Sequence, residues 1–316
     1  MQSAKIFSGT GSQGLAEQIC KRFGTKLGKV NIQRFSDGEI SPIFLESVRG
    51  DYVFLVQSTF SPAENLMELL LMIDAARRAS AYKVIAVIPY YGYARQDRKD
   101  RPRVAIGSKL IANMLVAAGA DRVITMDLHA PQIQGYFDIP VDHLDSHAVF
   151  IPYIENLKLE KLTFAAPDVG ATNRIREIAS YFNAEMVICD KHRKRANEIA
   201  SMVVIGDVTG KDIVIIDDIC DTGGTLAKSA GLLKEKGARS VRALITHPVL
   251  SGKAYENIEN SVLEELVVCD TIPVTKEKCS KIKVISVAEL FGVAIRNAFE
   301  NKSITSLFIH SQRRDK

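Results

Sequence analysis

The sequence predicts an α/β fold made of two similar domains, each a mainly parallel sheet flanked by helices. Short apolar strands alternate with amphipathic helices along the 316 residues, and the links are short, as in a parallel sheet covered on both faces. The layout strand, loop, helix, strand occurs twice, in residues 51–90 and 212–248. A chain that is 47% apolar at this length can bury two ordinary cores. We therefore expect domains at 1–146 and 147–316, divided where polar and turn-forming residues interrupt the alternation at 142–150.

Composition and charge favour a cytoplasmic protein with an anionic ligand. No apolar run approaches the about 20 residues of a bilayer span, and the N-terminus lacks a signal-peptide pattern, so we expect no membrane association. The five cysteines are odd in number, widely spaced and without a CxxC pair, which predicts reduced, mainly buried thiols. The net charge is only +4, but basic residues cluster at 95–103 and 191–195, and such a local excess attracts anions.

The first domain begins with a glycine-rich loop that has two interpretations. Gly9, Gly11 and Gly14 fit the GxGxxG pattern of dinucleotide-binding loops. That pattern requires an acid at the end of the second strand, whereas the strand expected at 29–35 ends without one, so we interpret the glycines as a tight turn. The apolar periods predict further strands at 5–9, 52–57, 83–90 and 122–129 and helices at 15–24, 64–78 and 108–118.

The second domain is organised around residues 213–225, IVIIDDICDTGGT. Four apolar residues predict a buried strand that ends at an acidic pair, Asp217 and Asp218. The turn 221–225 then leads into a helix over 226–236. Glycines let the backbone approach a ligand and the first amides of a helix suit a phosphate, whereas the two carboxylates suit sugar hydroxyls. The stretch therefore predicts a cradle for a sugar phosphate.

An ordinary strand-to-helix turn is the alternative interpretation of this stretch, since Asp, Thr and Gly are common turn and N-cap residues. Two adjacent acids at the end of a strand repel each other, however, and a purely structural turn has no need of them. We therefore favour the sugar phosphate. Strands at 162–167 and 185–190 complete the sheet expected around it.

Two stretches of the first domain carry groups that suit a nucleotide. In residues 34–39, RFSDGE, an aromatic side chain precedes an acidic turn centred on glycine and can stack on a purine, although such turns are also common structural features. The basic stretch 95–103 follows the end of a strand, where the ligands of parallel sheets bind. Arg95 and Gln96 are nearest to that end and are the better candidates for a nucleotide phosphate. The alternative is a solvated charged loop.

Two further features suit the transfer of a phosphate group. His129 and Asp168 each follow a strand, one in each domain. Such residues are more often simply packed, but together they can hold a magnesium ion that keeps most of its waters.

Residues 189–198, CDKHRKRANE, are the most basic segment of the chain. We expect them to close as a lid over polyphosphate, because phosphoryl-type transfers need neutralisation of charge more than a strong base. Surface or nucleic acid contacts are the alternatives. The basic runs lack interleaved aromatics, so we expect no nucleic acid.

Six motifs occur in the order seen in class I ribose-phosphate pyrophosphokinases, namely RFSDGE, YARQDRKD, ITMDLHAPQIQGYFDIP, APDVG, DKHRKRANE and DDICDTGGT. The chain resembles that family over its whole length, and a type I phosphoribosyltransferase would share only the last motif. The resemblance implies two phosphoribosyltransferase-type, Rossmann-like domains. A catalytically silent homologue would have lost the chemistry, whereas the matching basic, histidine and acidic positions are all present. One departure is Ala171, where the family commonly has a second glycine after PDVG.

The resemblance also implies a reaction and the roles of residues. ATP and ribose 5-phosphate would give AMP and 5-phosphoribosyl 1-pyrophosphate, with magnesium as the cofactor, for nucleotide biosynthesis. Lys191 and Arg193 match the catalytic lid residues, and His129 and Asp168 match the magnesium positions. The matching ATP positions are Phe35, Asp37, Gly38, Glu39, Arg95 and Gln96, and those for ribose 5-phosphate are Arg193, Asp217, Asp218, Asp221, Thr222, Gly223, Gly224 and Thr225.

Assembly and control are the last expectations from the resemblance. Class I members form hexamers in which RFSDGE completes a neighbour's ATP site, and a second anion site between subunits takes activating phosphate or inhibitory ADP. Two arginines with several hydroxyls can make charge-assisted bonds to one phosphate. The residues at positions resembling that second site are Ser47, Arg49, Ser80, Arg103, Ser303 and Thr305.

Overall fold

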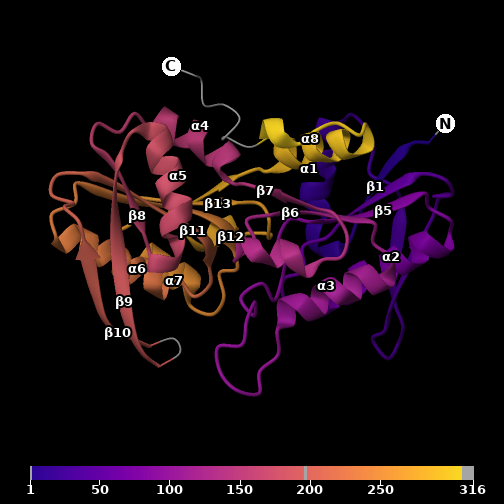
Figure 1. Cartoon of the computed structure of the whole chain (residues 1–316), viewed down its shortest axis with the longest axis horizontal. Coiled ribbons are helices and arrows are strands. Elements are labelled where there is room, and N and C mark those ends of the chain that lie inside the picture. Colours follow the sequence, from indigo (N-terminus) through magenta and orange to yellow (C-terminus); the bar gives the residue numbers. More distant parts are fainter. Residues whose placement is uncertain (1, 196–197, 308–316) are drawn as a thin grey trace. The chain divides into compact units, whose positions relative to one another are not determined.

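The computed structural model describes the backbone of residues 2–195 and 198–307 and the side chains of residues 2–190, 202–305 and 307 (Figure 1). The chain forms two compact units. The first contains the residues up to Ala148, Thr271–Pro273 and the described chain from Ser286, and the second contains Val149–Asp270 and Val274–Ile285. Each unit has a mainly parallel sheet flanked by helices, which confirms the predicted α/β fold.

The first unit is built on a five-stranded parallel sheet. In spatial order its strands are β1 (Ala4–Ser8), β4 (Tyr52–Val56), β5 (Lys83–Ile88), β6 (Arg122–Met126) and β7 (Val141–Leu144). Helices α2 (Glu64–Arg78) and α3 (Gly107–Ala118) pack on one face, where Leu69 and Ile73 join Val53 and Leu55 in the core. Helix α1 (Gln13–Phe23) lies on the opposite side of the sheet (Figure 1). Because all five strands are parallel, their carboxyl ends form one edge, which carries the loops after β4, β5 and β6.

The strand expected at 29–35 is present as β2 (Val30–Arg34), which pairs antiparallel with β3 (Ile40–Phe44) in a two-stranded sheet separate from the parallel one. The turn between the two strands closes locally, since the Phe35 amide donates to the Glu39 carbonyl at 2.9 Å and Gly38 takes a φ of +96°. Partly buried Val30 and Ile32 of the hairpin pack against the core that α2 and α3 cover. The hairpin therefore holds the 35–39 turn on a short rigid arm.

The second unit is built on a seven-stranded sheet. In spatial order the strands are β10 (Glu198–Ile205), β9 (Glu185–Arg195), β8 (Leu162–Ala166), β11 (Asp212–Cys220), β12 (Ser240–Pro248), β13 (Leu266–Cys269) and β14 (Ile282–Ile285). β10 runs antiparallel to β9, and the other neighbours are parallel. Leu226 and Ala230 of helix α6 (Gly224–Glu235) and Ile258 of helix α7 (Ala254–Glu259) join the core of Ile213 and Ile215 on one face. The remaining helices are α4 (His147–Leu157), which leads into this unit, and α5 (Thr172–Phe182), which follows β8.

The C-terminal helix α8 (Ala288–Phe299) belongs to the first unit, so the prediction that residues 147–316 form one domain is wrong for this segment. It packs beside α1 (Figure 1), and an added Cβ on Gly292 would lie 3.1 Å from Arg22 Cβ. The Arg296 guanidinium donates to the Phe23 carbonyl at 2.6 Å, and Phe299 meets the ring of Tyr52 edge-on. These contacts to α1 and β4 hold α8 in the first unit, although its position in the sequence directly after the second domain suggested that it belongs there.

Three smaller expectations can also be compared with the structure. All five cysteines are buried and free, as predicted. Within residues 2–195 and 198–307, no helix has both the length and the apolar character needed to cross a bilayer. Helices expected at 64–78 and 108–118 appear as α2 and α3 with nearly the same bounds.

Candidate functional site

The acidic pair of the second unit lies within β11, which extends further than the sequence predicted. β11 pairs with β8 only as far as Ile215, but on its other side it continues along β12 to Cys220. Asp217 and Asp218 therefore lie beyond the end of β8, and the Asp218 amide donates to the Asp217 carboxylate at 2.9 Å. The strand was expected to end before the acids because carboxylates are rare in buried strands. Pairing with β12 supplies the backbone hydrogen bonds that carry it on.

Arg174 on α5 is a member of this site that the sequence analysis missed. Its guanidinium lies 3.7 Å from an Asp218 carboxylate oxygen, with side-chain exposures of 19% for Arg174 and 9% for Asp218. Burial, followed by the negative charge of Asp218, raises the pKa of the Asp217 carboxyl well above its usual value, while Arg174 acts in the opposite direction and Asp168 adds a smaller rise. Arg174 lies six residues after Asp168 in the sequence, but only the packing of α5 alongside the sheet brings its side chain next to Asp218.

The loop from Asp221 to Gly224 follows β11 and starts α6. Gly223 has a φ of +70°, and an added Cβ there would lie 3.2 Å from the Ala254 carbonyl oxygen, so this position requires glycine. α6 begins at Gly224, so the amides of its first turn have no intrahelical acceptor and are available to an anion. The predicted phosphate loop thus has the backbone form that an anion site needs.

A segment on the outer side of this loop also contacts it and was missed by the sequence analysis. The Ser251 hydroxyl donates to the Asp221 carboxylate, and the Ser251 amide donates to the Asp221 carbonyl at 2.9 Å. The Asn257 side-chain amide donates to the Thr222 carbonyl at 2.8 Å. The segment lies about thirty residues further along the chain, which is why a reading of residues 213–225 alone does not find it.

Asp168 lies where β8 leads into α5. Its carboxylate accepts a hydrogen bond from the Ala171 amide at 3.2 Å and caps a short 3₁₀ turn, Val169–Ala171. The bond uses only the backbone of residue 171, so alanine makes it as well as glycine would. An added Cβ on Gly170 would come within 3.2 Å of the same carboxylate oxygen, so the neighbouring glycine keeps the approach to Asp168 open.

The basic segment expected to close as a lid lies, as far as its backbone is described, in two paired strands. β9 continues through the basic residues to Arg195 and pairs with β10, with Lys191 opposite Met202 and Arg193 opposite Ile199. The side chains of Lys191 and Arg193 lie outside the described residues. Cross-strand pairing with a strand later in the sequence therefore extends β9 into residues with poor β propensity.

The predicted ATP residues lie in two places in the first unit. Asp37, Gly38 and Glu39 form the tip of the β2–β3 hairpin, where the Glu39 amide donates to the Asp37 carboxylate at 3.0 Å. The neighbouring Phe35 ring is 54% exposed, as a stacking platform requires.

Arg95 and Gln96 are exposed in the loop after β5, while His129 is exposed after the adjacent strand β6. The Gln96 carbonyl accepts from the amide and the hydroxyl of Ser108 at 3.2 and 3.1 Å, which ties this loop to the start of α3. An added Cβ on Gly107 would lie 2.6 Å from the Gln96 side-chain oxygen, so the two segments are in close contact.

The glycine-rich loop after β1 is filled by the chain's own side chains, in agreement with its interpretation as a tight turn. Buried Glu68 accepts from the Thr10 amide and hydroxyl and, at 2.9 Å, from the Gln57 side-chain amide. An added Cβ on Gly9 would lie 2.4 Å from Gln57 Cδ and Glu68 Oε1. Gln57 occupies the position that Asp218 has in the sequence repeat, so the first unit has no open counterpart of the cradle at this strand end.

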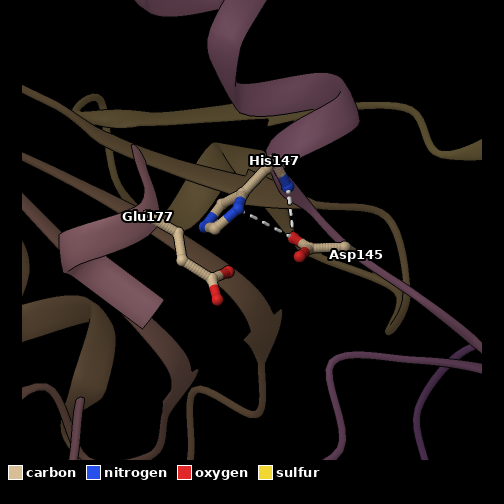
Figure 2. A group of neighbouring side chains, drawn as sticks. All are labelled: Asp145, His147 and Glu177. Atoms are coloured by element: carbon tan, nitrogen blue, oxygen red, sulfur yellow. Dashed lines mark hydrogen bonds and ion pairs between the residues drawn. The ribbon is translucent and has the colours of Figure 1, made fainter. Parts of the chain in front are cut away.

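The connection from β7 into α4 is held by two carboxylates. Asp145 accepts from the His147 amide at 2.8 Å, and its carboxylate lies 3.3 Å from Nδ1 of the buried His147 ring (Figure 2). Asp127, with a φ of +39°, accepts from the Ser146 amide at 3.1 Å. These bonds fix the turn from β7 into α4, and through Asp127 they tie that turn to the end of β6, which is followed by His129.

The expected effector residues are exposed in the first unit, and the structure brings some of them together. The Ser47 hydroxyl accepts from the Arg49 amide at 3.4 Å, and the adjacent Gly50 amide donates to the Ser80 carbonyl at 2.8 Å. Ser303 and Thr305 share a 2.8 Å hydroxyl bond. Arg103 lies separately in the loop after β5, with a φ of +66°.

Comparisons with known proteins agree with this geometry. Two family models match the chain: the N-terminal domain of ribose phosphate pyrophosphokinase over residues 4–119, and the phosphoribosyl synthetase-associated domain over residues 178–309. The ribose-phosphate pyrophosphokinase of Porphyromonas gingivalis is 55% identical over 304 residues, covering 96% of this chain and 97% of the relative. That of Campylobacter jejuni is 52% identical over 310 residues, covering 98% and 100%.

A solved structure gives the same result. The phosphoribosylpyrophosphate synthetase of Mycobacterium smegmatis superposes with a TM-score of 0.90 at 38% identity and covers 95% of this chain and all of that one. This similarity confirms the two phosphoribosyltransferase-type domains that the motifs implied. With both family models matched and relatives above 50% identity over nearly the full length, the chain is an enzyme that belongs to the ribose-phosphate pyrophosphokinase family.

Proposed function

We propose that the enzyme transfers the β,γ-pyrophosphoryl group of ATP to the C1 hydroxyl of ribose 5-phosphate, giving 5-phosphoribosyl 1-pyrophosphate and AMP for nucleotide biosynthesis in the cytoplasm. The observation that carries the proposal is the sequence of groups along β11 and α6, where two carboxylates are followed by a glycine turn and the open first turn of a helix. Carboxylates accept hydrogen bonds from sugar hydroxyls, and helix amides bind phosphate.

In the proposed complex Asp217 and Asp218 accept from the ribose hydroxyls, and the loop from Asp221 to Thr225 binds the 5-phosphate. The C1 hydroxyl oxygen then attacks the β-phosphorus of ATP, the bond from that phosphorus to the oxygen bridging it to the α-phosphorus breaks, and AMP leaves with that oxygen. Lys191 and Arg193 neutralise the charge of the transferring group, and Arg193 also reaches the sugar phosphate. Such a transfer depends on positioning and neutralisation, which fits a site with several cations and no dedicated strong base.

The nucleotide is proposed to bind the first unit. Arg95 and Gln96 contact its phosphates from the loop after β5, and the exposed Phe35 ring stacks on adenine. Asp37, Gly38 and Glu39 supply the polar contacts at the hairpin tip. An aromatic ring carried outward on a hairpin suits a site that another copy of the chain completes, and we propose a homohexamer on the family pattern.

Magnesium is the proposed cofactor, with His129 and Asp168 as its protein partners. The donor set is one imidazole and one carboxylate, each at the carboxyl end of a strand, and it fits an ion that keeps several waters and takes its other ligands from phosphates. When bound, the ion would neutralise phosphate oxygens. The role of the chain's own residues is to orient the carboxylate, which the Ala171 amide does for Asp168.

The experiment that tests the function uses ATP labelled at the γ-phosphate, ribose 5-phosphate and magnesium. We expect AMP, with the label in the sugar product. ADP formation would mean transfer of a single phosphoryl group and would overturn the proposed mechanism. Omission of ribose 5-phosphate is the control, and it should abolish AMP formation.

The effector proposal has its own experiment. We propose that inorganic phosphate activates and ADP inhibits through a site that includes Ser47, Arg49, Ser80, Arg103, Ser303 and Thr305. ADP inhibition against ATP should be non-competitive in the wild type and reduced in the Arg49→Ala plus Arg103→Ala double variant. Purely competitive inhibition that the double variant leaves unaltered would refute the site and leave the catalytic proposal standing.

A further inference from the structure

The segment from Ser251 to Ile258, called here the outer segment, packs against the proposed phosphate loop. It contacts three consecutive residues of the loop: Ser251 bonds to Asp221 at two points, Asn257 donates to the Thr222 carbonyl at 2.8 Å, and Ala254 and Ile258 lie under Gly223. Ala254 and Ile258 are fully buried, so this side of the loop rests on the hydrophobic core.

The peptide group between Thr222 and Gly223 is held at its carbonyl. This carbonyl accepts from the Asn257 side-chain amide at 2.8 Å. The planar peptide cannot rotate without losing that bond. Because Gly223 is in the left-handed conformation, this plane also sets the direction in which the chain enters α6. The free amides of Gly224 and Thr225 therefore point where the fixed peptide directs them.

We propose that Asn257 is a positioning residue for ribose 5-phosphate binding, because it fixes the Thr222–Gly223 peptide and so keeps the first-turn amides of α6 aimed at the phosphate before the ligand arrives. The inference rests on the proposed function of this loop. Pre-organisation of this kind lowers the cost of ordering the loop on binding and should act on affinity rather than on the transfer step.

The test compares steady-state kinetics and calorimetric binding of ribose 5-phosphate to the full-length wild type, Asn257→Leu and Asn257→Gln. Leucine has a similar size and no donor, so we expect KM and Kd for ribose 5-phosphate to rise about fivefold, the factor that one lost hydrogen bond gives, with kcat and the KM for ATP within about twofold. Glutamine retains the amide and should recover part of the affinity. Ser251→Ala, at the other end of the outer segment, should raise the same KM and Kd.

Glu256→Gln is the matched control, since this exposed side chain neighbours Asn257 on the same short helix and should leave both constants unaltered. An unaltered KM and Kd in Asn257→Leu would overturn the inference whatever Ser251→Ala does, as would a fall in kcat without a change in affinity. If the wild type binds ribose 5-phosphate but produces no AMP with ATP, the proposed function fails while the positioning role is still decided by the calorimetric comparison. Thermal unfolding of the ligand-free variants separates lost affinity from lost folding.

Discussion

Replacement of Arg174 by methionine is the perturbation whose effect the structure predicts most directly. Arg174→Met keeps the length of the side chain and removes the charge that lies 3.7 Å from Asp218. Coulomb's law with an effective dielectric constant of about 20 gives about 4.5 kcal/mol for two unit charges at that distance. Both side chains retain some exposure, so we expect a measured loss of about 3 kcal/mol in the free energy of unfolding, near the lower limit for breaking a buried ion pair.

The loss of stability in Arg174→Met should depend on pH, and the titration of the Asp217 carboxyl determines the direction. Burial and Asp218 already raise the pKa of the Asp217 carboxyl in the folded enzyme, and Arg174 opposes that rise. A carboxyl with a raised folded pKa binds more protons folded than unfolded, so stability falls as the pH rises from the unfolded value of about 3.9 through the folded pKa. Without Arg174 that pKa rises further. The deficit of Arg174→Met should therefore be larger at pH 8 than at pH 5.

Urea unfolding followed by circular dichroism at the two pH values measures this deficit. Arg176→Met is the control, because Arg176 is exposed and lies two residues away on the same helix. In an Asp218→Asn background, Arg174→Met should lower the free energy of unfolding by only a small fraction of its effect in the wild type, because the partner charge is gone. An equal deficit in both backgrounds, or one that does not change between pH 5 and pH 8, would refute the reasoning. The KM for ribose 5-phosphate should also rise in Arg174→Met.

Three further predictions concern other parts of the chain. Lys191→Ala should lower kcat by orders of magnitude with a modest change in KM, because in the proposed mechanism its charge is used mainly in the transition state. An unaltered kcat with weaker substrate binding would make Lys191 a docking residue only. Gly9→Ala should lower the free energy of unfolding by about 2–3 kcal/mol, because its Cβ would lie 2.4 Å from atoms of Gln57 and Glu68. Gly14→Ala is the control: nothing lies within 4 Å of its Cβ, so thermal unfolding should show it to be neutral or stabilising. Equal effects of the two substitutions would exclude the close packing around Gly9. Burial raises the pKa of the Cys220 thiol to about 12, so mass spectrometry should find it unmodified by iodoacetamide at both pH 7 and pH 9 until urea unfolds the enzyme, and rapid native labelling would contradict its burial.

Local patterns predicted the regular elements well because those elements bury one face. The apolar period of residues 64–78 gives α2 with its observed bounds, and the run at 213–216 gives the buried part of β11. The glycine turn and the acid pair were recognised for a similar reason: glycine pairs and adjacent carboxylates have few structural uses. These features are encoded within about fifteen residues of sequence.

The parts that the sequence did not reveal depend on partners far along the chain. β9 continues through Lys191 because β10 pairs with it, and β11 continues through Asp217 because β12 does. Arg174 and Asn257 join the site only when α5 and α7 return to the strand ends. The amino-acid sequence of a single helix such as α8 does not indicate the unit on which the helix packs. Non-local contacts of this kind leave no period or spacing in a sequence read alone.

The return of α8 to the first unit has a consequence for the way this protein is made on the ribosome. The nascent chain presents α1 early, but the helix that covers it, with Gly292 against Arg22 and Arg296 bonded to Phe23, is synthesised only after the whole of the second unit. The second unit can fold during synthesis as soon as β14 emerges, whereas the first must wait, with buried residues such as Ile19 still uncovered, until α8 has emerged as well. The first unit should therefore complete its folding after the second and be the one that chaperones engage during synthesis.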